Sequence, residues 1–186
     1  MNVKKICNRL REHGVQLTEG LTKDEIQLIE TTYQIDFPPD LKELLQHALP
    51  SGDKFPNWRD FSESNVHSLR TRLKWPLDGM LFDVEHNNFW HPSWGSKPDN
   101  VAAAKEICIH ECRSVPRLIP IYSHRYIPST PTEAGNPVFS VYQTDIIYYG
   151  ENLEEYLKVE FGEKPYNLIE FDRIKRIPFW TELVEE

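Results

Sequence analysis

Apolar residues recur every three or four positions in several stretches of this sequence, which is the spacing of one face of an α-helix. In residues 3–13 they fall at i, i+3, i+4 and i+7, and Gly14 follows as a stop signal, so we expect a short amphipathic helix. Thr22 and Glu25 form a capping box that begins a second helix, which ends at Tyr33. The same reasoning predicts four more helices: one from Pro38-Pro39 to before Pro50, one capped by Ser62 or Ser64 and ended by Pro76, one over 101–112, and one from Asn152 through Phe161.

Strand patterns are concentrated in the second half of the chain. β-Branched and aromatic runs at 118–121, 138–141 and 145–149 are separated by turn residues and predict the central strands of a sheet. The alternation in residues 80–85, after the turn signal Asp78-Gly79, predicts a half-buried strand that precedes them. Because helices come first and strands follow, the order favours an α+β domain over an alternating parallel sheet.

Size and composition support one folded domain. The chain has 186 residues, of which 39% are hydrophobic and 12% aromatic, and this is too many large side chains for a disordered polar chain. Its 21 basic and 29 acidic residues give a net charge of −8. A field of that sign repels nucleic-acid backbones and favours basic partners.

The sequence also bears on where the protein works. No stretch approaches the roughly 20 consecutive apolar residues that span a bilayer, and the first 14 residues have no signal-peptide core. Three cysteines are too few, and odd in number, for a disulfide framework. We therefore expect a cytoplasmic protein with no membrane contact.

A metal site is the first chemistry to weigh. Cys108 and Cys112 lie at i and i+4 on a predicted helix, so their thiols share a face, as two zinc ligands must. Zinc needs two further ligands, whereas His110 points off that face and the usual CxxC pairs are absent. We interpret the two cysteines as small core residues and expect no metal and no cofactor.

Two patterns suggest an enzyme, and neither meets the requirements of its chemistry. Ser93 and Gly95 match part of a nucleophile elbow, but His91 stands where the crowded turn needs its first glycine. Four residues near the predicted strand ends have the types for proton transfer, and nothing in their spacing requires them to meet: Asp83, Glu85, His86 and His124. We expect no catalytic residues.

One predicted helix face is basic, with Arg70, Arg72 and Lys74. In a chain this acidic, we interpret it as a solvated face and expect no direct contact with nucleic acid.

The order of the motifs resembles a known family. Residues 21–30, with the capping box, and residues 37–45, with a proline-started helix, resemble the opening of the SUKH superfamily, the Smi/Knr-like proteins. Later, residues 136–142 and 145–150 are similar to the strands that lead into the last long helix of that family. The resemblance covers residues 20–162, leaving an N-terminal helix in 1–19 and a C-terminal segment, 163–186, that we expect to pack on the same domain.

Some positions differ from the family pattern, and these differences concern which subgroup of the superfamily the chain resembles. Gln34 stands where the family often has glycine, Phe37 replaces the usual leucine before proline, and residues 49–52 replace an Asn-Gly pair.

The resemblance implies a central, mostly antiparallel sheet packed by helices, and it transfers no catalytic residues. Bacterial members look like immunity proteins that neutralise polymorphic toxins, many of them nucleases, and fungal relatives act as signalling hubs. It therefore implies a non-enzymatic immunity protein whose partner is a basic toxin domain, which the net charge of −8 would attract. A regulatory or scaffolding module is the alternative, and a hydrolase or metal enzyme using His86, His91 or His124 is a third.

For the partner-binding site, we select the predicted strand end and the loop after it. Asp83 and Glu85 would set the association rate, and Trp90 and Trp94 would anchor the interface. The alternative is that the tryptophans belong to the core and the acids are only solvated.

Overall fold

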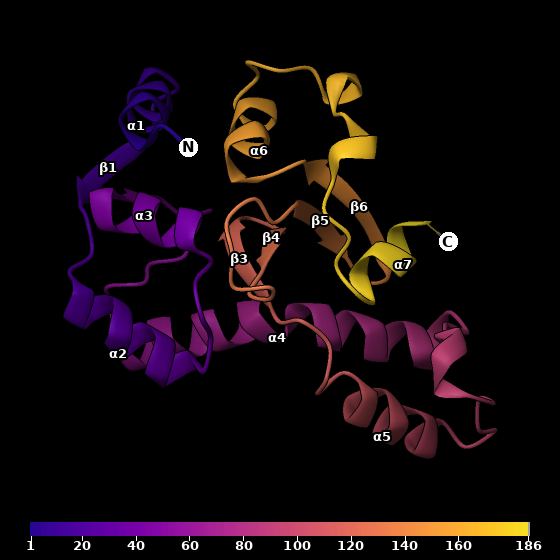
Figure 1. Ribbon diagram of the computed structural model, residues 1–186. Helices are drawn as coiled ribbons and strands as arrows, with labels where there is room; N and C mark the ends of the chain where they lie inside the picture. The colour runs from indigo at the N-terminus through magenta and orange to yellow at the C-terminus, as the bar shows by residue number, and fades with distance from the viewer. Residues whose placement is uncertain (186) are drawn as a thin grey trace.

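A computed structural model describes residues 1–185, and these form an α+β fold with two antiparallel sheets (Figure 1). The predicted α+β class and the antiparallel central sheet are confirmed. The helices are α1 (Val3–Glu12), α2 (Lys23–Tyr33), α3 (Pro39–His47), α4 (Glu63–His86), α5 (Val101–Glu111), α6 (Leu153–Glu160) and α7 (Trp180–Glu185), with short 3₁₀ turns η1 (Pro92–Trp94), η2 (Tyr166–Leu168) and η3 (Phe171–Arg173). The strands are β1 (Gln16–Glu19), β2 (Ala48–Ser51), β3 (Leu118–Tyr122), β4 (Arg125–Pro128), β5 (Val138–Tyr142) and β6 (Asp145–Gly150).

Side-chain caps explain where most of the helices begin. Each capping oxygen accepts a hydrogen bond from the amide three residues further on, which satisfies a donor that the first turn leaves free. The capping box of Thr22 and Glu25 is complete, because the Glu25 carboxylate also accepts from the Thr22 amide at 2.7 Å. The capping residues are Asn2, Thr22, Ser62, Asn100 and Asn152.

The prediction that Pro76 ends the fourth helix is wrong, because α4 runs through Pro76 to His86. Proline has no N–H to donate to the carbonyl four residues back, which is that of Arg72. The Tyr126 hydroxyl of β4 donates to that carbonyl instead, at 2.9 Å. A donor from the sheet therefore replaces the missing helix bond.

The predicted strand over residues 80–85 is wrong for the same reason, since these residues form the second half of α4. Met80 and Val84, at i and i+4, are buried against the sheet. Gly79 lies so close to the β5–β6 turn that a Cβ would come within 2.7 Å of the Gln143 Cα. Packing on the sheet, which is remote in sequence, thus selects a helix over a local alternation typical of a strand.

The main sheet is a meander in the order β3-β4-β5-β6, and β1 pairs with β2 separately. Sequence patterns found β3, β5 and β6. They missed β4, which carries Arg125 and ends in Pro128, and the short pair β1–β2, which contains Pro50. The two faces of the main sheet serve different clusters of the core.

One cluster joins the sheet to α1, α2, α3, α6 and the first half of α4, through Leu69. The other joins it to the second half of α4, α5 and α7. The C-terminal segment contributes Ile177 and Trp180 to the second cluster. The Trp180 indole N–H also donates to the Pro116 carbonyl at 2.6 Å, which ties α7 to the chain entering β3. Within residues 1–185, no helix is both long and apolar enough to cross a bilayer.

Candidate binding groove

Asp83 and Glu85 do not lie at a strand end, because the segment that carries them is helical. Trp90 and Trp94 lie in the loop and 3₁₀ turn that follow this helix. Asp83 is 3% exposed. Its carboxylate accepts hydrogen bonds from the Thr144 amide at 2.9 Å, the Thr144 hydroxyl at 2.6 Å and the Asn87 side chain at 2.6 Å. The two bonds from Thr144 fasten α4 to the β5–β6 turn, so the geometry gives Asp83 a structural task.

The other three residues are distributed between surface and core. Glu85 is exposed and pairs with Lys105 of α5, which holds the pKa of the Glu85 carboxyl below its usual value. Trp94 is 8% exposed and belongs to the core. Trp90 is half-buried, packs edge-on against Trp94, and donates from its indole N–H to the Gly95 carbonyl. Partner binding by these residues stays a prediction.

Residues 91–95, which match part of a nucleophile elbow, contain a serine–histidine contact that resembles part of a hydrolytic site. The Ser93 hydroxyl lies 2.7 Å from His91 Nδ1, and Glu182 Oε2 of α7 lies 3.3 Å from His91 Nε2. The Ser93 amide also donates to Nδ1, so His91 acts as the N-cap of the 3₁₀ turn η1. The imidazole is buried between Trp94 and Phe179, which is the arrangement of a residue that anchors a loop.

Among the described residues, the remaining catalytic and metal candidates meet only in pairs close in sequence: Glu85 with His86, at 3.7 Å between Oε2 and Nε2, and Cys108 with Cys112. Within residues 1–185, no three His, Cys, Asp or Glu side chains group as metal ligands. Cys108 is buried in α5 beside Cys112, and the contact lowers the pKa of the Cys108 thiol. His124 lies in the β3–β4 turn, where burial lowers the pKa of its imidazole. No hydrogen bond or ion pair in the described part of the chain links it to the other acid–base candidates.

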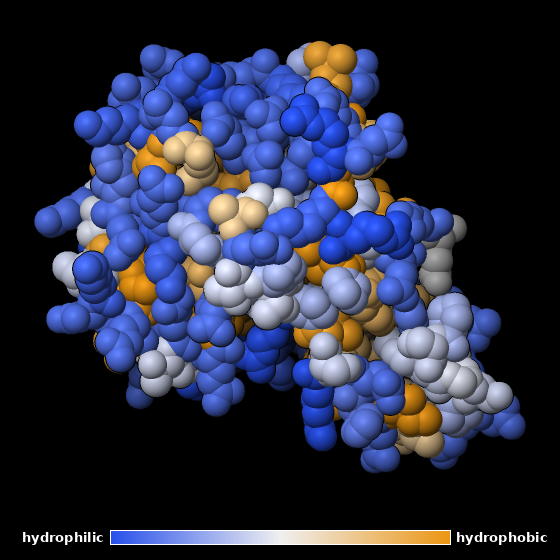
Figure 2. Space-filling view, in the orientation of Figure 1, coloured by the Kyte–Doolittle hydropathy of each residue, from blue (hydrophilic) through white to orange (hydrophobic). Residues whose placement is uncertain are grey.

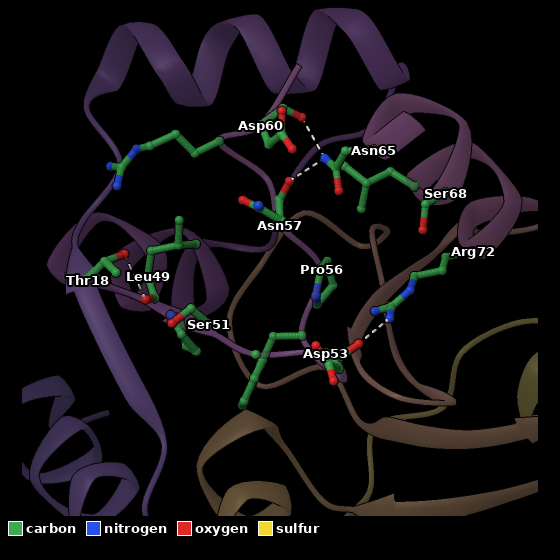
Figure 3. A pocket seen from close by; sticks show the side chains of 15 residues that line it. Thr18, Leu49, Ser51, Asp53, Pro56, Asn57, Asp60, Asn65, Ser68 and Arg72 are labelled. Carbon is green, nitrogen blue, oxygen red and sulfur yellow. Dashed lines mark hydrogen bonds between the residues drawn. The ribbon is translucent and has the colours of Figure 1, made fainter. Parts of the chain in front are cut away.

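A polar cleft of about 620 Å³ lies between the β1–β2 pair, the loop that precedes α4, and the first turns of α4 (Figure 3). Most of its polar side chains bond within the protein. Arg72 donates to the Asp53 and Lys54 carbonyls, and Asn65 donates to the Asn57 and Asp60 carbonyls. We interpret this cleft as the place where the loop is fastened to α4.

A second hollow, of about 610 Å³, lies under α4 and is hereafter called the α4 groove. In Figure 1, the C-terminal ends of α2 and α5 face one another below α4, and the segment from α5 to β3 runs up past α4 to the sheet. In Figure 2, the lower edge of the molecule is notched at this place, and apolar atoms show beside strongly hydrophilic ones. Its apolar lining comes from several elements: Leu73, Leu77 and Met80 of α4, Ile109 of α5, Val115 of the segment between α5 and β3, Leu118 of β3, and Trp180 of α7.

The charges around the α4 groove are all of one sign. Arg70 and Lys74 come from α4, Arg113 follows α5, and Arg117 precedes β3, whereas no Asp or Glu is among the described residues that line it. Arg117 donates to the Tyr33 and Gln34 carbonyls at 3.3 and 2.9 Å, which caps the C-terminus of α2. The other three cations form no ion pair with any residue in 1–185.

One polar group in the groove lining has no internal partner. Tyr33 is 5% exposed, and its hydroxyl is buried with no hydrogen-bond partner among the described residues. Burial raises the pKa of this hydroxyl, and the positive charge of Arg70 opposes that shift. The Tyr33 ring packs against Trp58 and Phe61, so this hydroxyl belongs to the core behind the groove.

Sequence reasoning noticed only part of this groove. It found the basic face of Arg70 and Lys74 and interpreted it as a solvated surface, and it singled out neither Arg113 nor Arg117. Nothing in the spacing links residues 70–74 to 113–117. Only the packing of α5 against α4 brings the two pairs together.

Searches against family models, curated proteins and solved structures found no match to this chain.

Proposed function

We propose that this chain is a non-enzymatic protein-binding module, and that its partner docks in the α4 groove. The observation that carries the proposal is an apolar floor partly exposed at Leu73, Leu77, Ile109 and Val115, combined with exposed cations of one sign. Three of these cations form no ion pair within residues 1–185. Surface clusters of this kind are typical of protein interaction sites, because a folded chain seldom leaves both apolar area and unpaired charge gathered in one concavity.

The resemblance to the Smi/Knr-like proteins suggests an immunity protein, whose partner is a toxin domain made by the same or a neighbouring cell. The net charge of −8 supports a partner that is basic overall, since opposite charges speed the encounter. The groove adds a local requirement, because its cations would repel a basic segment. We therefore propose a basic toxin domain that contacts the groove through a part that is not basic.

The proposal is tested by capture from the native host with the full chain as bait, at low and moderate salt. The matched baits carry Arg70→Gln, Lys74→Gln and Arg113→Gln in the groove, or Lys4→Gln, Lys5→Gln and Lys23→Gln elsewhere. Both sets remove three positive charges from exposed positions. Urea unfolding of each bait shows whether it is folded before use.

The immunity function is supported if the wild type and the control set both retain one toxin domain, and if that domain loses its toxicity when bound. A set of signalling proteins retained in its place would support the scaffolding alternative, and the toxin part of the proposal would fail. Retention of no protein by the wild type would remove the protein-binding function altogether.

A further inference from the structure

We infer that the ligand of the α4 groove is an acidic amphipathic helix, with a narrow apolar stripe and carboxylates on both flanks. This inference deepens the proposed function, on which it rests, by naming the chemistry of the segment that docks. It follows from the sign of the local field, the placement of the cations and the openness of the site.

The sign of the field is decided by comparing full and partial charges. Two helix C-termini, those of α2 and α5, face the groove, and each carries roughly −0.5 of an elementary charge. Four cations line it, and the described lining has no acid. The sum is about +3, so the groove favours an anionic ligand although the chain as a whole is acidic.

The cations lie on more than one side of the apolar floor. Arg70 and Lys74 are one turn apart on α4, and Arg113 lies at the end of α5 across the groove. A helix that buries its apolar stripe between them would therefore meet positive charge on both flanks. Carboxylates at those flanking positions can pair with arginine in bidentate geometry, and within residues 1–185 neither Arg70 nor Arg113 is already in an ion pair.

An open groove suits a segment of a partner protein better than a small apolar acid. Small-molecule sites enclose most of the ligand surface, whereas Lys74, Arg113 and Ile109 at this groove are exposed to solvent. Amphipathic helices that lie in hydrophobic grooves are recognised through side chains at i, i+3 or i+4, and i+7. The floor offers the partly exposed Leu73 and Leu77 of α4, at i and i+4, and the exposed Ile109 of α5.

The test uses two synthetic fluorescein-labelled peptides of about 18 residues, long enough to form a helix. Both carry leucine at one helical stripe, and the flanking positions are glutamate in one peptide and lysine in the other. Fluorescence anisotropy gives Kd for the full chain, for the variant Arg70→Gln/Lys74→Gln/Arg113→Gln and for the control Lys4→Gln/Lys5→Gln/Lys23→Gln. Near-UV circular dichroism of the variants checks their packing.

We expect the glutamate peptide to bind the wild type and the control at least about tenfold more tightly than the lysine peptide. The groove variant should lose about tenfold in affinity for the glutamate peptide, because each exposed ion pair contributes about 1.4- to 5-fold. Ile109→Asn should weaken the same peptide by several-fold, whereas Leu28→Asn, at an exposed leucine of α2, should not.

Two results would overturn the inference. One is equal binding of the two peptides, and the other is undiminished binding of the glutamate peptide by the groove variant. If the groove variant captured the native partner as well as the wild type does, the inference and the proposed docking site would be wrong, whereas the protein-binding function would stand. If the glutamate peptide bound as expected while the wild type captured no native protein, the inference would stand and the proposed function would fail.

Discussion

The passage of α4 through Pro76 yields a prediction about two residues that are far apart in sequence. The Arg72 carbonyl lacks its helical donor because Pro76 has no N–H, and the Tyr126 hydroxyl supplies the bond at 2.9 Å. Tyr126 is 2% exposed, and burial raises the pKa of its hydroxyl, so it stays a neutral donor. Tyr126→Phe removes that donor without changing the size of the ring.

The expected loss of stability follows from leaving the Arg72 carbonyl without a hydrogen-bond donor. We expect Tyr126→Phe to lower the free energy of unfolding by about 1–2 kcal/mol, the usual cost of a buried polar group left unpaired. In a Pro76→Ala background, the new amide of residue 76 can donate to the same Arg72 carbonyl. The cost of Tyr126→Phe should then fall by about 1 kcal/mol.

The assay is urea unfolding of the wild type, the two single variants and the double variant, monitored by far-UV circular dichroism. The coupling energy is read from the four free energies, provided that the denaturant slopes agree. Additivity within about 0.5 kcal/mol would refute the reasoning, because the hydroxyl would then contribute equally whether or not the helix has its own donor.

Three further predictions concern other parts of the fold. Asp83→Ala should cost about 2–4 kcal/mol in urea unfolding, because it removes the charged acceptor of the Thr144 amide and hydroxyl, and a cost under about 1 kcal/mol would contradict its structural task. Arg59 lowers the pKa of Glu25 to about 2, so the stability that Glu25 contributes is present above its unfolded pKa, near 4.3, and is lost as pH falls toward 2. Glu25→Gln should therefore reduce the acid dependence of the free energy of unfolding in that window by about 1 kcal/mol, and an unchanged profile would remove this role. Gly150→Ala should prevent folding or lower Tm steeply by circular dichroism, because the added Cβ would lie 2.4 Å from the backbone of α6; a variant with wild-type Tm would show that the contact can relax.

The elements that sequence reasoning found are those whose signals are local. The Thr22–Glu25 capping box and the Asn152 cap each involve residues three apart, and they mark the starts of α2 and α6. The patterns at 118–121, 138–141 and 145–149 hold enough β-branched and aromatic residues to predict strands from composition alone.

The elements it missed depend on partners far along the chain. The donor that lets α4 continue past Pro76 lies 54 residues from the carbonyl it satisfies. β4 contains Arg125, whose charge argues against a buried strand. The structure pairs that guanidinium with Glu160 and stacks it 3.7 Å from the Tyr149 ring centroid. The α4 groove was missed in the same way, because its cations come from two separate segments.

The net charge of the whole chain is negative and the local charge of the α4 groove is positive, and this difference affects the kinetics of binding. A net charge of −8 acts over about one Debye length, roughly 8–10 Å at physiological salt, so it governs the approach of a partner. The groove cations act at contact, where they hold a segment already docked. A basic domain that carries one acidic helix satisfies both fields: salt should slow its association with the wild type, and the groove substitutions should chiefly speed its dissociation. If those substitutions changed only the association rate, the groove would act by steering and the docked segment would lie elsewhere.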